Sequence, residues 1–163
     1  MIVLKHPLIV KSIAWPDEAA TQVFAQALAA RSVINDALIE LHGDLGAGKT
    51  TFARHLLAAL GVEGRIKSPT YAVVETYTLA GQSSKAFSIS HFDFYRFNNP
   101  DEWEEAGFRD LFADPGLKLV EWPEKAGEYL PQCDLKLVIA VMPDESRSVE
   151  LSALTPLGAE LIA

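Results

Sequence analysis

The feature that most constrains the fold is an eight-residue segment, Gly43 to Thr50, with the sequence GDLGAGKT. It matches the phosphate-binding pattern G-x-x-x-x-G-K-[ST] at every fixed position. The preceding residues 37–42 (ALIELH) are short and mostly apolar, which predicts a strand. Residues 52–60 (FARHLLAAL) predict a helix that ends at Gly61. A strand, a glycine-rich loop and a helix form the context that this motif requires.

The residue types in this segment suit a nucleoside triphosphate with its Mg²⁺. Glycines let successive backbone N–H groups turn inward around a phosphate, and the helix N-terminus adds unpaired N–H groups and partial positive charge. Lys49 is expected to reach the β- and γ-phosphates, and the Thr50 hydroxyl is expected to ligate Mg²⁺. The predicted nucleotide-binding residues of the segment are Leu45, Gly46, Ala47, Gly48, Lys49, Thr50 and Thr51.

The bulk composition is that of an ordinary globular chain. A length of 163 residues predicts a single domain, and we interpret residues 1–163 as one P-loop nucleotide-binding domain. The longest apolar run, Leu135 to Met142, is far too short to cross a bilayer. The first seven residues lack the pattern of a signal peptide. The single cysteine, Cys133, fits a reducing compartment, so we expect a cytoplasmic protein that has no membrane partner.

The chain is acidic, with 22 Asp and Glu against 14 Lys and Arg and a formal net charge of −8. A protein that grips nucleic acid without help normally presents a large basic face. The charge therefore argues against direct binding of RNA or DNA, and it suits contact with a basic protein partner.

The remaining elements are read from periodicity and turn residues. Pro16 is expected at position N1 of a helix whose apolar face includes Val23, Phe24, Ala27 and Leu28, with residues 31–36 closing that helix. Residues 72–79 and 86–92 predict an antiparallel hairpin around a turn at 80–84. Further strands are expected at residues 9–14, 117–122, 135–141 and 148–152. Together these predict a three-layer α/β P-loop NTPase fold with a mixed parallel and antiparallel sheet.

Two acids could complete the site, because ligands of open α/β sheets gather at the carboxyl ends of the strands. Glu121 ends one predicted strand and could hold the metal; Asp93 follows another and could orient or deprotonate the attacking water. Either acid could instead be a plain surface residue. His91 lies in phase with Asp93, and as a packed residue it is as reasonable as a catalytic one. Trp122 could stack in the site, but a buried residue at a strand end is the preferred interpretation.

Four segments in order resemble one known family. They are residues 43–51 (GDLGAGKTT), 68–71 (SPTY), 91–96 (HFDFYR) and 119–123 (LVEWP). This ordered set is similar to the bacterial TsaE family, formerly YjeE, of small ATPases. The first segment alone occurs in many NTPases, whereas the set with these intervals is specific.

The resemblance implies an ATPase needed to make threonylcarbamoyladenosine beside the anticodon of tRNA. It implies a TsaB–TsaD complex as the partner, reset by ATP hydrolysis, with tRNA contacted only indirectly. It also places the Mg²⁺ ligands on Thr50 and Glu121 and the catalytic residues on Asp93 and Lys49. By the same likeness Glu18 and Arg147 flank the adenine, although the sequence around Arg147 matches the family only loosely.

Three other functions remain open from the sequence. A small-molecule P-loop kinase would have a similar length and loop, but the residues after Arg96 include no arginine cluster for a lid. A GTPase would carry an Asn-Lys-x-Asp guanine motif, which the chain lacks. The third alternative is a nucleotide-bound scaffold whose role is assembly.

Overall fold

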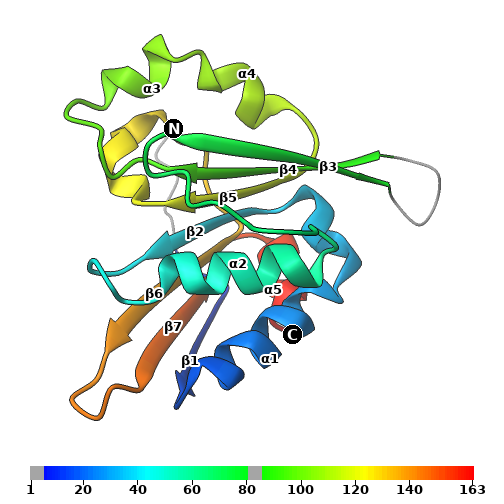
Figure 1. The fold of residues 1–163 in the computed structure, drawn as a ribbon, viewed down its shortest axis with the longest axis vertical. Helices are drawn as coiled ribbons and strands as arrows, with labels where there is room; N and C mark the ends of the chain where they lie inside the picture. The colour runs from blue at the N-terminus through cyan, green and yellow to red at the C-terminus, as the bar shows by residue number, and fades with distance from the viewer. Residues whose placement is uncertain (1–5, 81–85) are drawn as a thin grey trace.

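One seven-stranded sheet organises the chain in a computed structural model that describes residues 6–80 and 86–163 (Figure 1). The strands are β1 (Ile9–Trp15), β2 (Leu38–His42), β3 (Val74–Ala80), β4 (Ala86–Asp93), β5 (Leu117–Glu121), β6 (Leu135–Val141) and β7 (Arg147–Ala153). Their order across the sheet is β1-β7-β6-β2-β5-β4-β3. The four central strands, β6, β2, β5 and β4, are parallel, and β7, β1 and β3 join as antiparallel neighbours. The predicted mixed sheet is confirmed.

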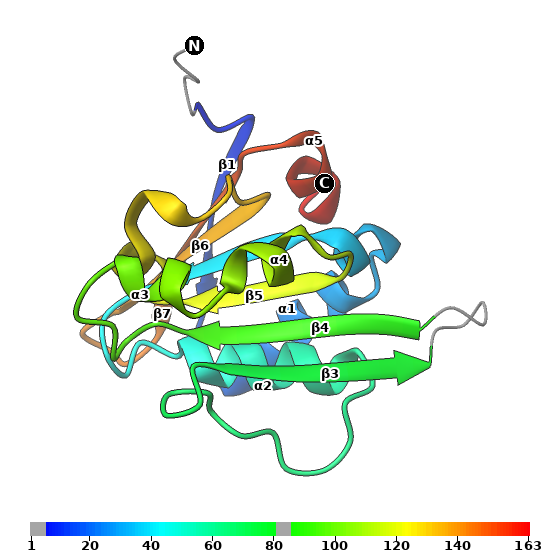
Figure 2. The ribbon, with the colours of Figure 1, turned by 90° about the horizontal axis from the view of Figure 1, so that it is seen from above.

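Helices cover both faces of this sheet. They are α1 (Glu18–Ala29), η1 (Ser32–Asp36), α2 (Lys49–Ala59), α3 (Asp101–Glu105), α4 (Phe108–Ala113), η2 (Pro123–Tyr129) and α5 (Pro156–Leu161), where η marks a 3₁₀-helix. The α1 and α2 helices pack side by side on one face, and α3 and α4 lie beyond β4 and β5 on the other (Figure 2). The result is a three-layer arrangement.

The side chains of the central strands alternate between two hydrophobic clusters, as the pleat requires. Ile39, Leu41 and Leu119 face α2 and pack with its residues Phe52 and Leu56. The intervening residues of the same strands face the other layer, where Leu38, Phe92 and Val120 pack with Trp103 and Phe108. This alternation decides which side chains meet the phosphate loop, because α2 begins directly at that loop.

Two expectations about the first helix are wrong. Asp17 is the N-cap of α1 and its carboxylate accepts a hydrogen bond from Ala20 N at 2.9 Å, so Pro16 lies outside the helix instead of at N1. The helix also ends at Ala29. Residues 31–36 do not extend it, because the chain turns at Arg31 and forms the separate η1.

The buried face of α1 also differs from the expected one. Thr21, Ala25 and Leu28 are buried, whereas Val23 is 65% exposed. The helix packs against α2 and the edge strand β1, so its buried side includes Thr21 and Ala25 and leaves Val23 outside. Phe24 lies against Trp15 and Phe52, as a core residue should.

The predicted hairpin is confirmed, because β3 and β4 pair antiparallel from Val74 opposite Phe92 to Ala80 opposite Ala86. The turn predicted at 80–84 falls largely outside the described residues. Every helix in residues 6–80 and 86–163 is too short or too polar to cross a membrane.

Candidate nucleotide-binding site

The phosphate loop joins β2 to α2 in a conformation that two of its glycines make possible. Gly48 is the N-cap of α2 and has a φ of 111°, in the region that side chains with a Cβ rarely adopt. Gly43 has a φ of 149°, and a Cβ there would lie 2.5 Å from the carbonyl oxygen of Ile139 on β6. The loop is therefore packed directly against the sheet.

The Lys49 side chain folds back over this loop. Its Nζ contacts the carbonyl oxygen of Gly43 and donates a hydrogen bond to that of Asp44 at 2.9 Å. The ammonium also lies 4.2 Å from the centre of the Trp122 ring, within cation–π range. Burial lowers the pKa of Lys49, and the nearby carboxylates, led by Glu121, oppose that shift. The lysine is thus held at the place where a phosphate would meet the loop.

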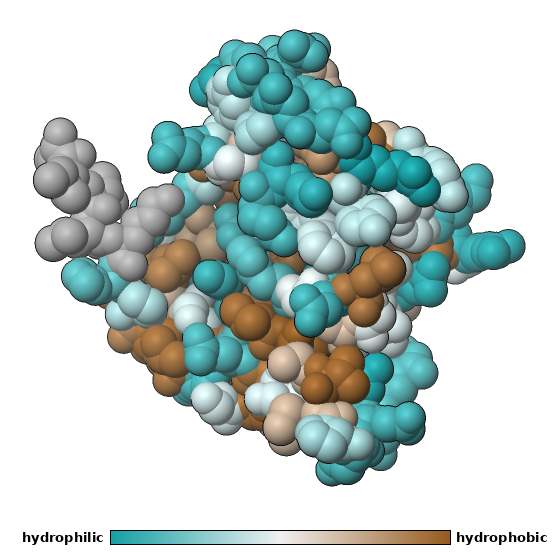
Figure 3. All heavy atoms as spheres, turned by 90° about the vertical axis from the view of Figure 1, so that its left-hand side faces the viewer, coloured by the Kyte–Doolittle hydropathy of each residue, from teal (hydrophilic) through white to brown (hydrophobic). Residues whose placement is uncertain are grey.

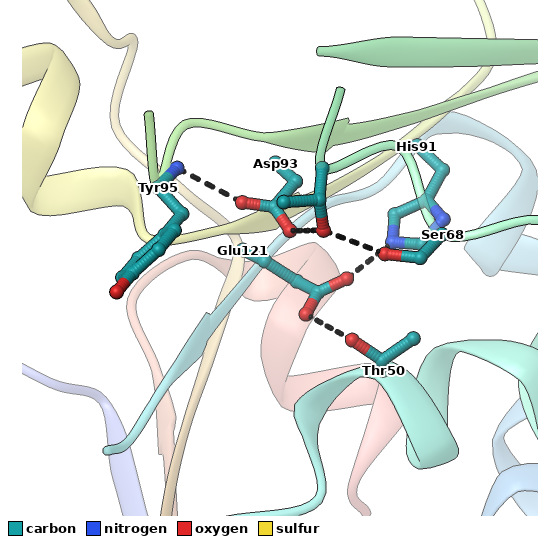
Figure 4. A network of polar contacts seen from close by, with 7 residues as sticks. Thr50, Ser68, His91, Asp93, Tyr95 and Glu121 are labelled. Carbon is teal, nitrogen blue, oxygen red and sulfur yellow. Dashed lines mark hydrogen bonds and ion pairs between the residues drawn. The ribbon is translucent and has the colours of Figure 1, made fainter. Parts of the chain in front are cut away.

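Beneath the loop, three side chains form one hydrogen-bonded chain (Figure 4). Thr50 Oγ1 donates to Glu121 Oε1 at 2.8 Å, and His91 Nε2 lies 2.7 Å from Glu121 Oε2. Glu121 is 1% exposed and His91 is fully buried. The acid predicted at the end of β5 therefore meets the hydroxyl predicted at the start of α2, although 71 residues separate them in the chain.

Asp93 lies at the end of β4, beside these three hydrogen-bonded side chains. Its Oδ1 accepts a hydrogen bond from Tyr95 N at 2.9 Å, and its Oδ2 accepts one from Thr70 Oγ1 at 3.1 Å. Thr70 is in turn 2.8 Å from the Ser68 hydroxyl. Burial raises the pKa of Asp93, and the neighbouring Glu121 adds to that rise. A carboxylate held in this way is oriented and has increased basicity.

Two cavities meet at the loop and share Gly46, Gly48, Thr51 and Arg147 in their walls. The smaller, about 260 Å³, is lined by the reactive groups, including Lys49, Thr50, Thr70, Asp93, Glu121 and Trp122. The larger, about 470 Å³, lies between the start of α1 and the β6–β7 turn and includes Trp15, Asp17, Glu18, Thr21, Val141 and Glu145. Together they offer one site with a phosphate end and a second, wider end.

The residues predicted for the base lie at that wider end. Glu18 lines the larger cavity, and its carboxylate is 2.9 Å from His55 Nε2. Arg147 Nε donates to the carbonyl oxygen of Ala47 at 3.0 Å, which fixes the guanidinium against the loop. Leu45 is 73% exposed at the loop tip, whereas Ala47 is buried. The structure thus brings every predicted site residue to one edge of the sheet, the edge at which the central parallel strands have their carboxyl ends.

Figure 3 looks straight at that edge, where apolar side chains are interspersed with polar ones across the middle and lower part of the face. Leu45, Val141 and Met142 are among the large apolar side chains that are exposed.

The preferred interpretation of Trp122 as a buried strand-end residue is wrong. The side chain is only partly buried and its ring stands over Lys49, which agrees with the alternative of a ring that stacks in the site. The ring also packs on Tyr95, with centroids 5.0 Å apart. The backbone of Trp122 adopts φ 55°, a left-handed conformation, immediately before Pro123. That unusual turn projects the ring over the loop, and no periodicity in the sequence reports it.

The oxygen donors fit a hard divalent cation. Thr50 Oγ1 and a Glu121 oxygen lie 2.8 Å apart directly beside the loop. In the described residues, no group of three or more His, Cys, Asp or Glu side chains converges as a metal site. A two-ligand site suits Mg²⁺, which usually keeps several waters and binds through one or two protein oxygens and substrate phosphates.

Comparison with known proteins identifies the family of this chain. Residues 15–149 match the family model described as threonylcarbamoyl adenosine biosynthesis protein TsaE. A Haemophilus influenzae protein named tRNA threonylcarbamoyladenosine biosynthesis protein TsaE is 44% identical over 126 residues, which cover 77% of this chain and 76% of that protein. Its Bacillus subtilis namesake is 35% identical over 147 residues, 88% of this chain and 87% of that one.

A solved structure shares the fold. The crystal structure of Bacillus subtilis YdiB superposes with a TM-score of 0.73 at 29% sequence identity, covering 94% of this chain and 93% of that one. The expected α/β P-loop fold is therefore confirmed. Since the family match spans most of the sequence and two relatives exceed 30% identity over most of both chains, the chain belongs to the TsaE family.

Proposed function

We propose that this protein is a Mg²⁺-dependent ATPase that acts in the threonylcarbamoyladenosine modification of tRNA. The observation that carries the proposal is the convergence of Thr50, Glu121 and Asp93 at the phosphate loop. In a hydrolytic site, Thr50 and Glu121 would bind the metal ion and Asp93 would orient the attacking water. Family membership supplies the pathway, because the relatives are named for threonylcarbamoyladenosine biosynthesis.

In this proposal the chain's own groups bind and orient the nucleotide. The N–H groups at the start of α2 receive the phosphates, and Lys49 exchanges its loop carbonyl contacts for phosphate oxygens. Thr50 and Glu121 would hold Mg²⁺, which when bound neutralises charge on the β- and γ-phosphates. The larger cavity, with Glu18 and Arg147 in its walls, receives the adenosine.

Asp93 is the proposed base for the attacking water. Its two oxygens are held by Tyr95 N and Thr70 Oγ1, so its orientation is set before substrate binds. The raised pKa makes it a stronger base than an ordinary aspartate, because proton transfer improves as the pKa of the base approaches the working pH.

We further propose that the protein works on a TsaB–TsaD complex and touches tRNA only through it. A net charge of −8 disfavours direct binding to the phosphate backbone. Exposed apolar side chains such as Leu45 and Tyr71, which are 73% and 83% exposed, suit a protein partner. Co-purification with TsaB and TsaD, with and without ATP, tests this part directly.

The hydrolytic role is tested by phosphate release from Mg²⁺-ATP, with TsaB and TsaD present. Asp93→Ala should lower turnover by about 10²–10⁴-fold, the usual contribution of a general base, while the nucleotide dissociation constant changes little. Asp110→Ala, an exposed acid on α4, is the matched control and should behave as wild type. Wild-type turnover in the Asp93→Ala protein would contradict the assigned base; turnover by neither protein would favour a scaffold.

A further inference from the structure

His91 is a buried polar residue that the proposed reaction does not yet use. It lies on β4 between Ile89 and Asp93, and all three side chains face α2 because they alternate with residues of the opposite face. Its relative exposure is 0%. A fully buried imidazole is costly unless its polar atoms are satisfied, so its contacts indicate what it does.

Among residues 6–80 and 86–163, the one side-chain hydrogen bond of His91 is with the proposed metal ligand. His91 Nε2 lies 2.7 Å from Glu121 Oε2, while Glu121 Oε1 accepts from Thr50. The strand register explains the meeting: Asp93 pairs with Glu121 across β4 and β5, and His91 stands one step back on the same face. The two carboxylate oxygens therefore have different partners, one in the core and one at the phosphate loop.

The other ring nitrogen indicates which of the two nitrogens donates in this contact. His91 Nδ1 is buried and has no hydrogen-bond partner among the described residues. A hydrogen on Nδ1 would be buried without an acceptor, whereas an unprotonated Nδ1 leaves only a lone pair. The geometry thus favours the arrangement in which Nε2 carries the hydrogen and donates it to Glu121.

We propose that His91 is a positioning residue: it holds Glu121 by one oxygen so that the other stays at Thr50, where the cation of the nucleotide would bind. This inference rests on the proposed function, because it assigns His91 to the same site. Residues that orient a ligand of a metal commonly change metal affinity by about 10–100-fold when they are replaced. A histidine that merely fills space would affect folding without changing the dependence on Mg²⁺.

Two variants separate donor from volume. His91→Phe keeps a ring of similar size and removes the hydrogen-bond donor. His91→Gln can place an amide N–H near the position of Nε2 and so keep the donor. Phe92→Leu is the matched control, because this neighbouring core residue packs in the hydrophobic cluster on the other face of the sheet.

The experiment is a calorimetric titration of ADP into the purified full chain, in EDTA and at a series of Mg²⁺ concentrations. Thermal unfolding of each ligand-free variant is recorded alongside. For His91→Phe we expect the half-effective Mg²⁺ concentration to rise about 10–100-fold, with ADP affinity in EDTA within about twofold of wild type. His91→Gln should recover most of the Mg²⁺ response, and Phe92→Leu should lose thermal stability with an unchanged Mg²⁺ response.

A wild-type Mg²⁺ response in His91→Phe, or failure of His91→Gln to recover it, would overturn the positioning role alone. If wild-type protein itself binds ADP without any Mg²⁺ effect, the proposed function fails and takes this inference with it. Should His91→Phe not fold, His91→Asn provides the same test. The asparagine side chain is one methylene shorter than that of glutamine, so its amide should not reach the Glu121 carboxylate. The Asn variant is expected to lose the Mg²⁺ response.

Discussion

Replacing Glu121 in two ways should separate its structural contacts from its charge. Glu121→Gln keeps the side-chain shape, with its oxygen able to accept from His91 Nε2 and its NH₂ group able to donate to Thr50 Oγ1. Glu121→Ala removes the carboxylate, so His91 and Thr50 both lose their hydrogen-bond acceptor. The first variant therefore tests the charge, and the second tests the hydrogen bonds.

The expected sizes follow from burial. In Glu121→Ala the buried Nε2–H of His91 loses its acceptor, which costs about 1–3 kcal/mol of unfolding free energy. At roughly 2–4 °C per kcal/mol for a domain of this size, Tm should fall by about 2–12 °C. In Glu121→Gln both hydrogen bonds persist. The lost charge relieves a repulsion of Asp93 and removes an attraction to the buried Lys49, and these two effects oppose each other. Its Tm should therefore stay near that of wild type.

The assay is thermal unfolding of ligand-free protein followed by circular dichroism, paired with ADP titrations at increasing Mg²⁺. Glu121→Gln should combine unimpaired stability with a strongly reduced Mg²⁺ response, because Mg²⁺ prefers an anionic oxygen to an amide. If Glu121→Gln is as unstable as Glu121→Ala, the hydrogen-bond account is wrong. If it keeps the full Mg²⁺ response, Glu121 is not the metal ligand.

Three further predictions address other parts of the site. Because burial raises the pKa of Asp93 above its ordinary 3.8, wild type should gain stability as pH falls through the raised pKa towards 3.8. Asp93→Asn should lack that gain in urea unfolding between pH 3.5 and about 8; parallel curves for the two proteins would refute it. Arg147→Ala removes a hydrogen bond to the phosphate loop and should weaken ADP binding about tenfold in calorimetry, with unchanged affinity counting against a role at the base. Gly43→Ala places a Cβ 2.5 Å from the Ile139 carbonyl oxygen and should cost about 1–3 kcal/mol in urea unfolding. Gly64→Ala, also at positive φ but with no atom within 4 Å of the added Cβ, isolates the backbone effect, and equal losses in both variants would refute the steric argument.

The phosphate loop and its surroundings could be predicted from the sequence because the relevant physics is local. Gly43 to Thr50 form one continuous segment, and the strand and helix beside it have clear periodicity. The acids at the ends of β4 and β5 could be proposed because parallel strands end at a common edge. The contact between Thr50 and Glu121 follows from that rule because β2, which leads into the phosphate loop, lies beside β5 in the sheet.

What the sequence could not reveal depends on long-range geometry. The meeting of His91 with Glu121 requires the β4–β5 register, in which Asp93 lies opposite Glu121, and sequence spacing carries no information about register between distant strands. The turn at Trp122 that places its ring over Lys49 is a tertiary feature. The exposed Val23 shows that a helix can turn its apolar stripe away when neighbouring helices fix its rotation.

We propose that ATP hydrolysis at the phosphate loop resets the TsaB–TsaD complex between cycles of tRNA modification. The decisive measurement is threonylcarbamoylation of tRNA with purified TsaB and TsaD under multiple-turnover conditions, comparing wild-type protein with Lys49→Ala. Lys49 lies against the phosphate loop and is the proposed ligand of the phosphates. Its loss should therefore abolish ATP binding and confine the reaction to about one turnover per complex. Modification at the full multiple-turnover rate with Lys49→Ala would show that ATP binding at this loop is not needed for repeated cycles.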